Sequence, residues 1–377
     1  MAFKTRKKEE FLYSSPQEMY QDNKVKKIMG PLDYQAAMLD LYMQNINKKS
    51  VALELPTGSG KTLVGLLIGE YRRRKNKEKV LFLCPTNQLV HQVVEQSNLK
   101  YGLKAIAFCG KQKDYSPKDK SNFLMAEAIG VTTYSSFFAV HSFFEDVDVI
   151  IMDDVHSCED YIISNWTIQI ERESTAFIEM AKLLRPFISE TDYKYLLEDE
   201  YIPEVASWCN MLPMPLILSK LDEIQTVLQQ GIEIGTSNYY AYSRISENLK
   251  ECNIYIANRK ILIRPWIAPT MFFKAFANAK QRVLMSATLG RSGELERITG
   301  IEKIFRLPIV NDWDKKGLGR KFFTFPDLSL GEEEQGNVIM ALQNLCKKSV
   351  FLVPDSLSAE TIKQFYEDNL KEVKVFE

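Results

Sequence analysis

The stretch Val51–Glu70, VALELPTGSGKTLVGLLIGE, decides how the rest of the chain is interpreted. Its first residues form an apolar run rich in strand-forming side chains, and this run stops at Pro56. Gly58 and Gly60 follow, and the residues after Gly60 have the spacing of a helix. Glycine reaches backbone angles closed to other residues, so the main-chain N–H groups of such a loop can face one way. The stretch therefore predicts a strand, an anion-binding loop and a helix in succession.

An anion on this loop would lie at the N-terminus of the following helix, where the helix dipole favours negative charge. Lys61 would reach the β- and γ-phosphates of a nucleotide, and the Thr62 hydroxyl would bind Mg²⁺. The residues predicted to bind the nucleotide are those of the loop: Thr57, Gly58, Ser59, Gly60, Lys61 and Thr62. The full consensus has glycine where this chain has Leu55, so a plain glycine-rich turn is the alternative.

Patterns of buried strands recur along the chain and alternate with helical patterns. The near-continuously apolar runs are 51–55, 80–84, 105–108, 129–133 and 148–154. Such runs are typical of strands that are buried on both faces. Helical spacing separates them, for example in Thr62–Lys75 and Asn87–Ser97. The alternation predicts an α/β domain with a parallel sheet.

The segment VIIMDDVH, residues 149–156, places two acids at the end of one of these strands. In open α/β sheets, ligands bind beyond that end of the strands. Adjacent carboxylates repel each other, which is unfavourable in simple packing but suits a site for Mg²⁺. We expect Asp153 to hold the metal ion and Asp154 to orient or deprotonate an attacking water. An acidic strand terminus without function is the alternative.

The strand pattern stops after Asp154 and returns at 282–288. We therefore predict a mainly helical insertion over 157–262, with helical spacing in segments such as 204–230 and 242–260. The predicted organisation is a basic segment at 1–30, an α/β domain formed by 31–156 and 263–320, the insertion, and a further block at 321–377. The aromatic residue of 263–269, Trp266, fits either a core segment or a base-stacking platform.

The composition limits the partners of the chain. A net charge of −1 gives no global attraction to nucleic acid, so any polyanion must be bound by a local groove. The six cysteines form no CxxC pair, which favours reduced thiols in the cytoplasm or nucleus and argues against zinc. No apolar run is long enough to span a membrane, and no apolar segment follows the basic N-terminus, so we expect neither a membrane partner nor secretion.

In their order and spacing, these motifs resemble those of superfamily-two DExH helicases over residues 31–157 and 262–300. The resemblance implies a RecA-like P-loop NTPase lobe that uses ATP and Mg²⁺, with Lys61, Asp153, Asp154 and His156 as its catalytic residues. It implies that Gln35 reads adenine and that His156 is bonded toward Ser286 or Thr288. A buried core histidine is the alternative for His156. The implied coupling residues are Ser286, Ala287 and Thr288, and the implied nucleic-acid contacts are Thr86, Asn87, Gln88, Gln92, Thr133 and Tyr134.

The layout resembles that of the XPD/DinG-like DNA helicases, because a long insertion separates His156 from Ser286. In that group the insertion forms an arch over the DNA. The iron–sulfur cluster of the group needs four cysteines between the phosphate loop and the acidic pair, and only Cys84 and Cys109 lie there, so no cluster is expected. Asp154 stands where the group has glutamate, and this shorter side chain predicts slow hydrolysis.

The resemblance also implies a second RecA-like lobe. Residues 321–377 resemble only the incomplete start of one, with its first strand beginning at Ser349, since such a lobe needs about 150 residues. No arginine follows Arg320, and losing an arginine finger typically costs about 10³–10⁵ in rate. We therefore expect the motor region of an ATP-dependent DNA helicase, weakly active alone, with single-stranded or forked DNA as partner. Two alternatives stay open: an ATP-gated switch completed by a protein partner, in repair or antiviral defence, and an RNA-dependent ATPase.

Overall fold

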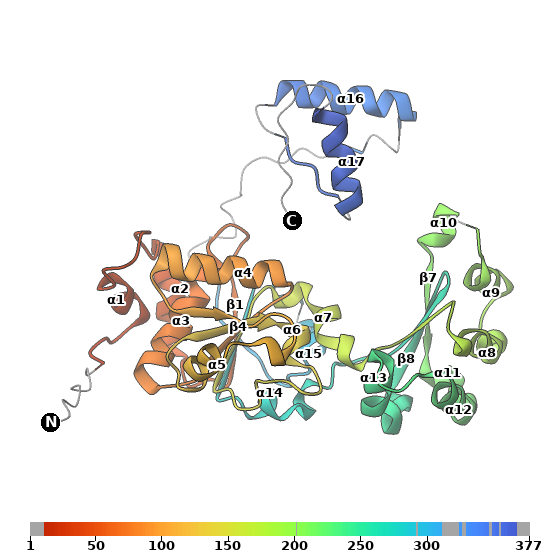
Figure 1. The fold of residues 1–377 in the computed structure, drawn as a ribbon, viewed down its shortest axis with the longest axis horizontal. Coiled ribbons are helices and arrows are strands. Elements are labelled where there is room, and N and C mark those ends of the chain that lie inside the picture. Colours follow the sequence, from red (N-terminus) through yellow and green to blue (C-terminus); the bar gives the residue numbers. More distant parts are fainter. Residues whose placement is uncertain are drawn as a thin grey trace. The chain divides into compact units, whose positions relative to one another are not determined.

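The computed structural model describes residues 11–200, 202–291, 293–310, 324–325, 329–346, 349–353 and 356–367. The chain divides into two compact units, residues 1–314 and residues 315–377. The first unit holds two β-sheets together with the helices that flank them (Figure 1). Each unit is described by itself.

The larger sheet has seven strands in the order β11-β1-β10-β5-β2-β4-β3, and all of its pairs are parallel. Its strands are β1 (Ser50–Glu54), β2 (Val80–Cys84), β3 (Ala105–Ala107), β4 (Ile129–Thr133), β5 (Val149–Met152), β10 (Gln281–Ser286) and β11 (Phe305–Arg306). Parallel strands end at the same edge of a sheet, so the loops that follow them are brought together. The predicted α/β fold with a parallel sheet is confirmed.

The larger sheet and the helices that pack around it are called the lobe below. Its helical elements come from both sides of the insertion in the sequence. They are α1 (Pro16–Gln21), α2 (Asp33–Gln44), α3 (Lys61–Asn76), α4 (Asn87–Glu95), the π-helical turn η1 (Gln96–Tyr101), η2 (Gln112–Asp114), α5 (Pro117–Leu124), α6 (Tyr134–Phe137), η3 (Val155–Ser157), η8 (Thr270–Phe272), α14 (Lys274–Asn278) and α15 (Glu294–Thr299). Gly65 lets α3 approach the sheet closely, because a Cβ there would lie 2.6 Å from the Met285 side chain. This contact seats the helix that follows the phosphate loop.

Alternate residues of the parallel strands enter different apolar cores on the two faces of the sheet. Val51 and Leu53 of β1 pack with α3, whereas Ala52 joins the core on the other face. Both kinds of residue are fully buried, which explains why the sequence of each strand is almost continuously apolar.

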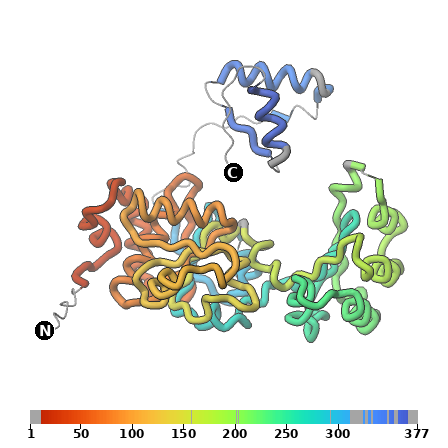
Figure 2. The backbone as a smooth tube through the Cα atoms, in the orientation of Figure 1, coloured from red at the N-terminus to blue at the C-terminus, as the bar shows by residue number. Residues whose placement is uncertain are grey.

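The insertion lies between β5 and β10, where the chain leaves the parallel sheet and later returns to it (Figure 2). Its helical elements are α7 (Glu159–Ile163), η4 (Ser164–Trp166), α8 (Thr175–Leu184), η5 (Arg185–Phe187), α9 (Glu190–Leu197), α10 (Pro203–Ala206), α11 (Met214–Ile217), η6 (Leu218–Lys220), α12 (Leu221–Gly231), α13 (Ser237–Ile245) and η7 (Ser246–Glu251). It also contains an antiparallel sheet in the order β6-β9-β8-β7, formed by β6 (Ile168–Glu171), β7 (Cys209–Pro213), β8 (Cys252–Ala257) and β9 (Lys260–Pro265).

This second sheet corrects part of the helical prediction for the insertion. The segments 204–230 and 242–260 do contain helices, but β7 runs through the first and β8 through the second. In β8 the residues alternate between buried and half-buried, which is the period of a strand with one face on a core. The helical interpretation is therefore wrong for these strands.

The second unit contains α16 (Glu332–Leu345) and α17 (Ser356–Glu367). The sequence predicts a strand at the segment beginning with Ser349, but the structure assigns none to the described residues 349–353. The prediction of a lobe start at 321–377 otherwise falls partly outside the described residues, as does the basic segment before Phe11. Within the parts of the chain that the structure describes, no helix has the length and apolar character needed to cross a membrane.

Candidate nucleotide site

The candidate site lies where β1, β10 and β5 end, with β10 between the other two strands. The phosphate loop follows β1, the segment 286–288 begins at the last residue of β10, and the acidic pair follows β5. The sheet order therefore brings three motifs that are far apart in the sequence to one edge. The backbone N–H of Leu55 donates to the Ser286 carbonyl over 2.9 Å, which continues the β1–β10 pairing to the start of the loop.

The phosphate loop has the backbone that its glycines predict. Gly58 and Gly60 have φ of 80° and 77°, in the left-handed region, and α3 begins directly afterwards at Lys61. The Gln35 side-chain amide donates to the Ser59 carbonyl over 2.8 Å, and the Tyr34 hydroxyl donates to the same oxygen over 2.5 Å. A Cβ at Gly60 would lie 2.5 Å from Gln35 Nε2, so the loop and α2 are closely packed.

Gln35 therefore has a structural task at this site. It is 4% exposed, and its Oε1 accepts a hydrogen bond from the Leu32 backbone N–H over 2.9 Å. With both ends of its side chain bonded, Gln35 ties the start of α2 to the phosphate loop. Its predicted contact with adenine stays a prediction.

Lys61 and Asp154 form the central contact of the site, with Nζ and Oδ1 3.0 Å apart. Lys61 is the first residue of α3, and Asp154 follows β5 with its backbone in the left-handed region at φ 51°. The Lys61 side chain is 15% exposed and the Asp154 side chain 42%. The two predicted motifs thus share one half-buried ion pair.

Asp153 lies deeper, and burial raises the pKa of its carboxyl from 3.8 to about 6. The positive charge of Lys61 opposes that rise, while the negative charge of Asp154 adds to it. A buried carboxylate with a raised pKa is stabilised by a cation, and Mg²⁺ is commonly held by one or two carboxylates together with substrate phosphates. The donor set of Asp153 and the Thr62 hydroxyl therefore fits Mg²⁺. Among the described residues, no group of three or more His, Cys, Asp or Glu side chains has the arrangement of a self-contained metal site.

His156 lies between the acidic pair and the segment after β10. Its Nδ1 is 2.8 Å from Thr288 Oγ1, and its Nε2 is 3.1 Å from Glu294 Oε1. The sequence predicted a partner at Ser286 or Thr288, and the structure places Thr288 there. Ser286 is buried at the end of β10, and Ala287 is half-buried beside it. Glu294 could not be predicted from the sequence, because no motif marks it and it lies far from His156 along the chain.

The predicted nucleic-acid residues fall into two sets. Asn87, Gln88 and Gln92 lie on exposed positions of α4, and the Thr86 hydroxyl caps that helix by accepting the Leu89 N–H over 3.3 Å. Thr133 and Tyr134 differ from this arrangement. The Thr133 hydroxyl accepts the Ser136 N–H, and it is only 7% exposed.

Tyr134 is fully buried, and its hydroxyl donates to the Asp153 carbonyl over 2.7 Å. Its side chain therefore supports the end of β5 and does not reach nucleic acid. This corrects the role that the sequence analysis gave to Tyr134. The physical reason is that the short helix α6 turns this side chain into the core under the acidic pair.

Comparison with known proteins places this site in a family context. Residues 28–181 match the family model described as "Type III restriction enzyme, res subunit", a helicase domain. The matched range contains both the phosphate loop and the acidic pair, so the chain is similar to superfamily-two helicases. A search among curated proteins finds no match.

Three solved structures illustrate the likeness at the level of the fold. A structure of XPD without ligand is 21% identical, covers 72% of this chain and 57% of its own, and has a TM-score of 0.42. Xpd4 of S. tokodaii is 19% identical over 73% of this chain and 60% of its own, with a TM-score of 0.41. The DUF1998 helicase MrfA is 14% identical over 91% of this chain and 39% of its own, with a TM-score of 0.43. The chain thus spans about 60% of the length of these two XPD structures.

Proposed function

We propose that this chain is the nucleotide-binding motor region of an ATP-dependent DNA helicase or translocase. The observation that carries the proposal is the Lys61–Asp154 pair, because it joins the phosphate loop to the acidic strand end at 3.0 Å. A triphosphate on the loop amides would be within reach of both. The helicase domain matched over residues 28–181 supports the same reaction class.

Each residue then has a defined task. Lys61 binds the β- and γ-phosphate oxygens, and the backbone N–H groups of the loop donate hydrogen bonds to the same phosphates. Thr62 and Asp153 would hold Mg²⁺, which would neutralise the charge that develops on the phosphate oxygens. Asp154 accepts the proton of the attacking water, whose oxygen bonds to the γ-phosphorus while the bond from that phosphorus to the ADP oxygen breaks.

The ion pair implies an order of events. While Lys61 is bonded to Asp154, the Lys61 ammonium occupies the carboxylate oxygen Oδ1 that a water would need to reach. Phosphate binding draws Lys61 away and frees Asp154 for the water. Because Asp154 is one methylene shorter than glutamate, the freed carboxylate is drawn back from the water, so hydrolysis is slow.

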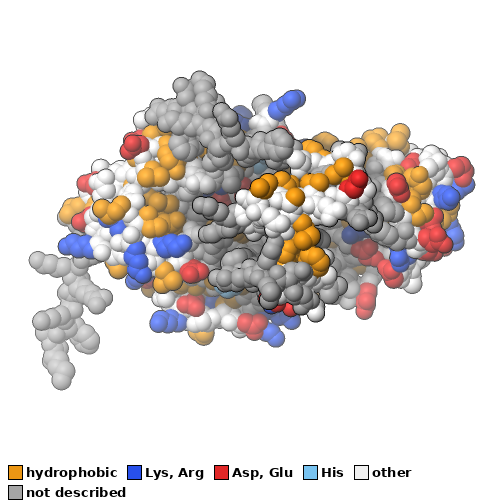
Figure 3. All heavy atoms as spheres, turned by 90° about the horizontal axis from the view of Figure 1, so that it is seen from above, with side chains coloured by type: hydrophobic (Ala, Val, Ile, Leu, Met, Phe, Trp, Pro, Cys, Tyr) orange, Lys and Arg blue, Asp and Glu red, His pale blue; other side chains and the backbone are white. Residues whose placement is uncertain are grey.

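Nucleic acid is bound locally and through its backbone in this proposal. Basic and acidic side chains are mixed on the face seen in Figure 3, in keeping with the near-zero net charge. The exposed polar residues of α4 and its cap Thr86 are suited to phosphate contacts. Binding should therefore fall with added salt and depend little on base sequence.

A nucleotide titration with two variants tests the proposal. Lys61→Ala removes the cation from the β/γ-phosphates, and a lost hydrogen bond to a charged group of about 1.5–3 kcal/mol weakens ATP binding by about 10–150-fold. Asp154→Ala does not weaken ATP binding, because it removes the residue that competes with phosphate for Lys61, but it loses hydrolysis because the base is gone. The measurements are titration with a fluorescent ATP analogue and release of phosphate. Equal ATP affinity in the parent and both variants would remove the site assignment.

An ATP-gated switch is the second candidate, and the Lys61–Asp154 pair favours it because that pair is broken by nucleotide without any hydrolysis. The two candidates differ in one measurement. A motor needs turnover to displace a strand, whereas a switch changes its affinity for nucleic acid on ATP binding alone. Strand displacement that persists in Asp154→Ala would contradict the motor, and DNA and RNA oligomers in competition would decide the substrate.

A further inference from the structure

The short helix α15 contacts the nucleotide site at its first residue. Glu294 Oε1 lies 3.1 Å from His156 Nε2, and Glu294 Oε2 accepts the Arg291 backbone N–H over 3.1 Å. The other ring nitrogen of His156 is 2.8 Å from Thr288 Oγ1. Gly290 makes room for this cluster, because a Cβ there would lie 2.3 Å from Glu294 Oε2. Both polar ends of the His156 ring are thus fixed by the segment that follows β10.

The same helix contacts the base of the insertion one turn later. Arg297 donates from Nη1 and Nη2 to the two carboxylate oxygens of Glu159, the first residue of α7, over 2.7 Å each. Arg264 of β9 lies 3.5 Å from the same Glu159 and 2.7 Å from Asp160. The Arg297 guanidinium also lies 5.4 Å from the ring centre of Trp266.

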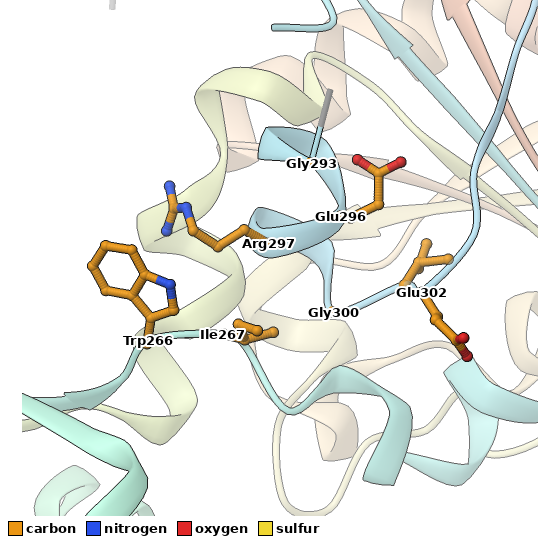
Figure 4. A pocket seen from close by; sticks show the side chains of 8 residues that line it. Trp266, Ile267, Gly293, Glu296, Arg297, Gly300 and Glu302 are labelled. Atoms are coloured by element: carbon orange, nitrogen blue, oxygen red, sulfur yellow. The ribbon is translucent and has the colours of Figure 1, made fainter. Parts of the chain in front are cut away.

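Glu294 and Arg297 are three residues apart, which places them on one face of the helix. Figure 4 shows Arg297 leaving α15 on the side of Trp266, while Glu296 leaves on the other side. The Arg297–Glu159 pair is more protected from solvent than the Glu294–His156 contact, with side chains 28% and 27% exposed. The hydrogen bonds from Arg297 lower the pKa of Glu159. Bidentate arginine–carboxylate pairs fix geometry as well as adding energy.

We propose that α15 is a mechanical link between the nucleotide site and the insertion, in which Glu294 positions His156 and Arg297 ties the helix to Glu159, which Arg264 of β9 also contacts. The link rests on the proposed function and extends it. Because α15 is a short helix held at both contacts, a shift of His156 on nucleotide binding moves Glu159 and the end of β9 with it. Interfaces of this kind pass small displacements on as discrete steps.

Hydrogen exchange of the insertion with and without ATP and Mg²⁺ tests the link directly. In the parent chain, nucleotide changes the exchange of β8 and β9 by about fivefold or more, the lower end of typical coupling between sites. In Arg297→Gln that response is lost, while the affinity for the ATP analogue stays within about threefold of the parent. Arg297→Lys keeps the cation with a single donor group, and its response is intermediate.

Glu296→Gln is the matched control, because Glu296 lies on the same helix and holds Arg306 by two bonds of 2.6 and 2.7 Å, away from the insertion. This variant loses a bidentate pair of the same kind but keeps the response of β8 and β9. Thermal unfolding of every variant checks that it is folded. Should Arg297→Gln fail to fold, Glu159→Gln cuts the same contact from the other side.

The outcomes separate the link from the proposed function. A parent that binds ATP without any change in β8 and β9 overturns the link and leaves the nucleotide site standing. The link is likewise overturned when Arg297→Gln responds like the parent, or when Glu296→Gln loses the response equally. A parent that does not bind ATP refutes the proposed function, and the link falls with it.

Discussion

The two sheets of the first unit are built on different principles. Strand β5 of the parallel sheet is buried at every residue, whereas β8 of the antiparallel sheet alternates between buried and half-buried. The parallel sheet has helices and apolar cores on both faces, and its functional residues lie beyond the strand ends. In the antiparallel sheet, every second side chain along β8 is partly exposed to solvent. The lobe is therefore suited to holding a site rigid, and the insertion offers surface.

The charged residues of the two regions follow the same division. In the lobe, Arg72 holds Glu78 over 2.5 Å and 2.9 Å, with side chains 9% and 4% exposed. In the insertion, Lys182 and Glu179 are bonded over 2.7 Å but are 61% and 59% exposed. A buried charge depends on its partner, whereas an exposed one is solvated by water when the partner is removed. The free energy of unfolding should therefore respond very differently to cutting the two pairs.

The largest effect is expected for Glu78→Ala. This change leaves the Arg72 guanidinium buried without its carboxylate, which typically costs about 3–5 kcal/mol. Hydrogen exchange at β1 and β2 measures the loss in the lobe. Hydrogen exchange at β8 and β9 follows the insertion separately. A loss below about 1 kcal/mol would show that the buried pair behaves like an exposed one, and the contrast between the regions would be wrong.

The next effect concerns Asp153 and depends on pH. Burial raises the pKa of this carboxyl from 3.8 to about 6, so between those values the folded protein keeps a proton that the unfolded chain has released. Stability therefore falls as the pH rises through that window, by about 3 kcal/mol at most. Asp153→Asn should remove this fall and stabilise the protein at pH 7, while abolishing hydrolysis. Urea denaturation at several pH values checks it, and an unchanged slope would contradict the assignment.

A smaller effect separates the two glycines of the phosphate loop. Alanine at Gly58 meets nothing within 4 Å and pays only for its positive φ, about 1 kcal/mol. Alanine at Gly60 also collides with Gln35, which adds about 1–3 kcal/mol. Thermal unfolding of both variants measures the difference, and Gly60→Ala should cost less in a Gln35→Ala background than in the parent, by the collision part. Equal destabilisation by both alanines would show that the loop and α2 are not tightly packed.

The lobe could be predicted from the sequence because its signals are local. The apolar runs gave six of the seven strands of the parallel sheet and missed the short strand β11. A loop between an apolar strand and a helix placed Lys61 at the start of α3. The meeting of Lys61 with Asp154 followed from one rule, that parallel strands end at a common edge. These features need no knowledge of distant residues.

The antiparallel sheet of the insertion was harder to predict, because the turn between β8 and β9 carries no recognisable sequence signal. The hairpin between β8 and β9 turns at Asn258 and Arg259, and Arg259 adopts the left-handed conformation at φ 61°. Hairpin turns of this length are recognised by glycine, which is missing here. The alternation in β8, with Cys252, Ile254 and Ile256 buried, was the signal that could have found the strand.

Two further features depended on tertiary packing. Nothing in the residues around Tyr134 indicates that its hydroxyl reaches the Asp153 carbonyl. Trp266 was expected either in the core or on a base-stacking platform, and it is 49% exposed beside the Arg297 guanidinium. Contacts between segments so far apart in the sequence follow from the fold and leave no pattern in either segment.

The smallest expected effect is for Glu179→Gln in the insertion, and it completes the contrast with Glu78. Glu179 and Lys182 are three residues apart on the exposed side of α8, where such pairs stabilise a helix by about 0.2–0.5 kcal/mol. Glutamine keeps the length and helix propensity of the side chain, so only the charge interaction is lost. Hydrogen exchange of α8 at increasing urea concentration should show a shift within that range, and added salt should erase it. A loss comparable to that of Glu78→Ala would mean that exposure does not govern the strength of ion pairs in this chain.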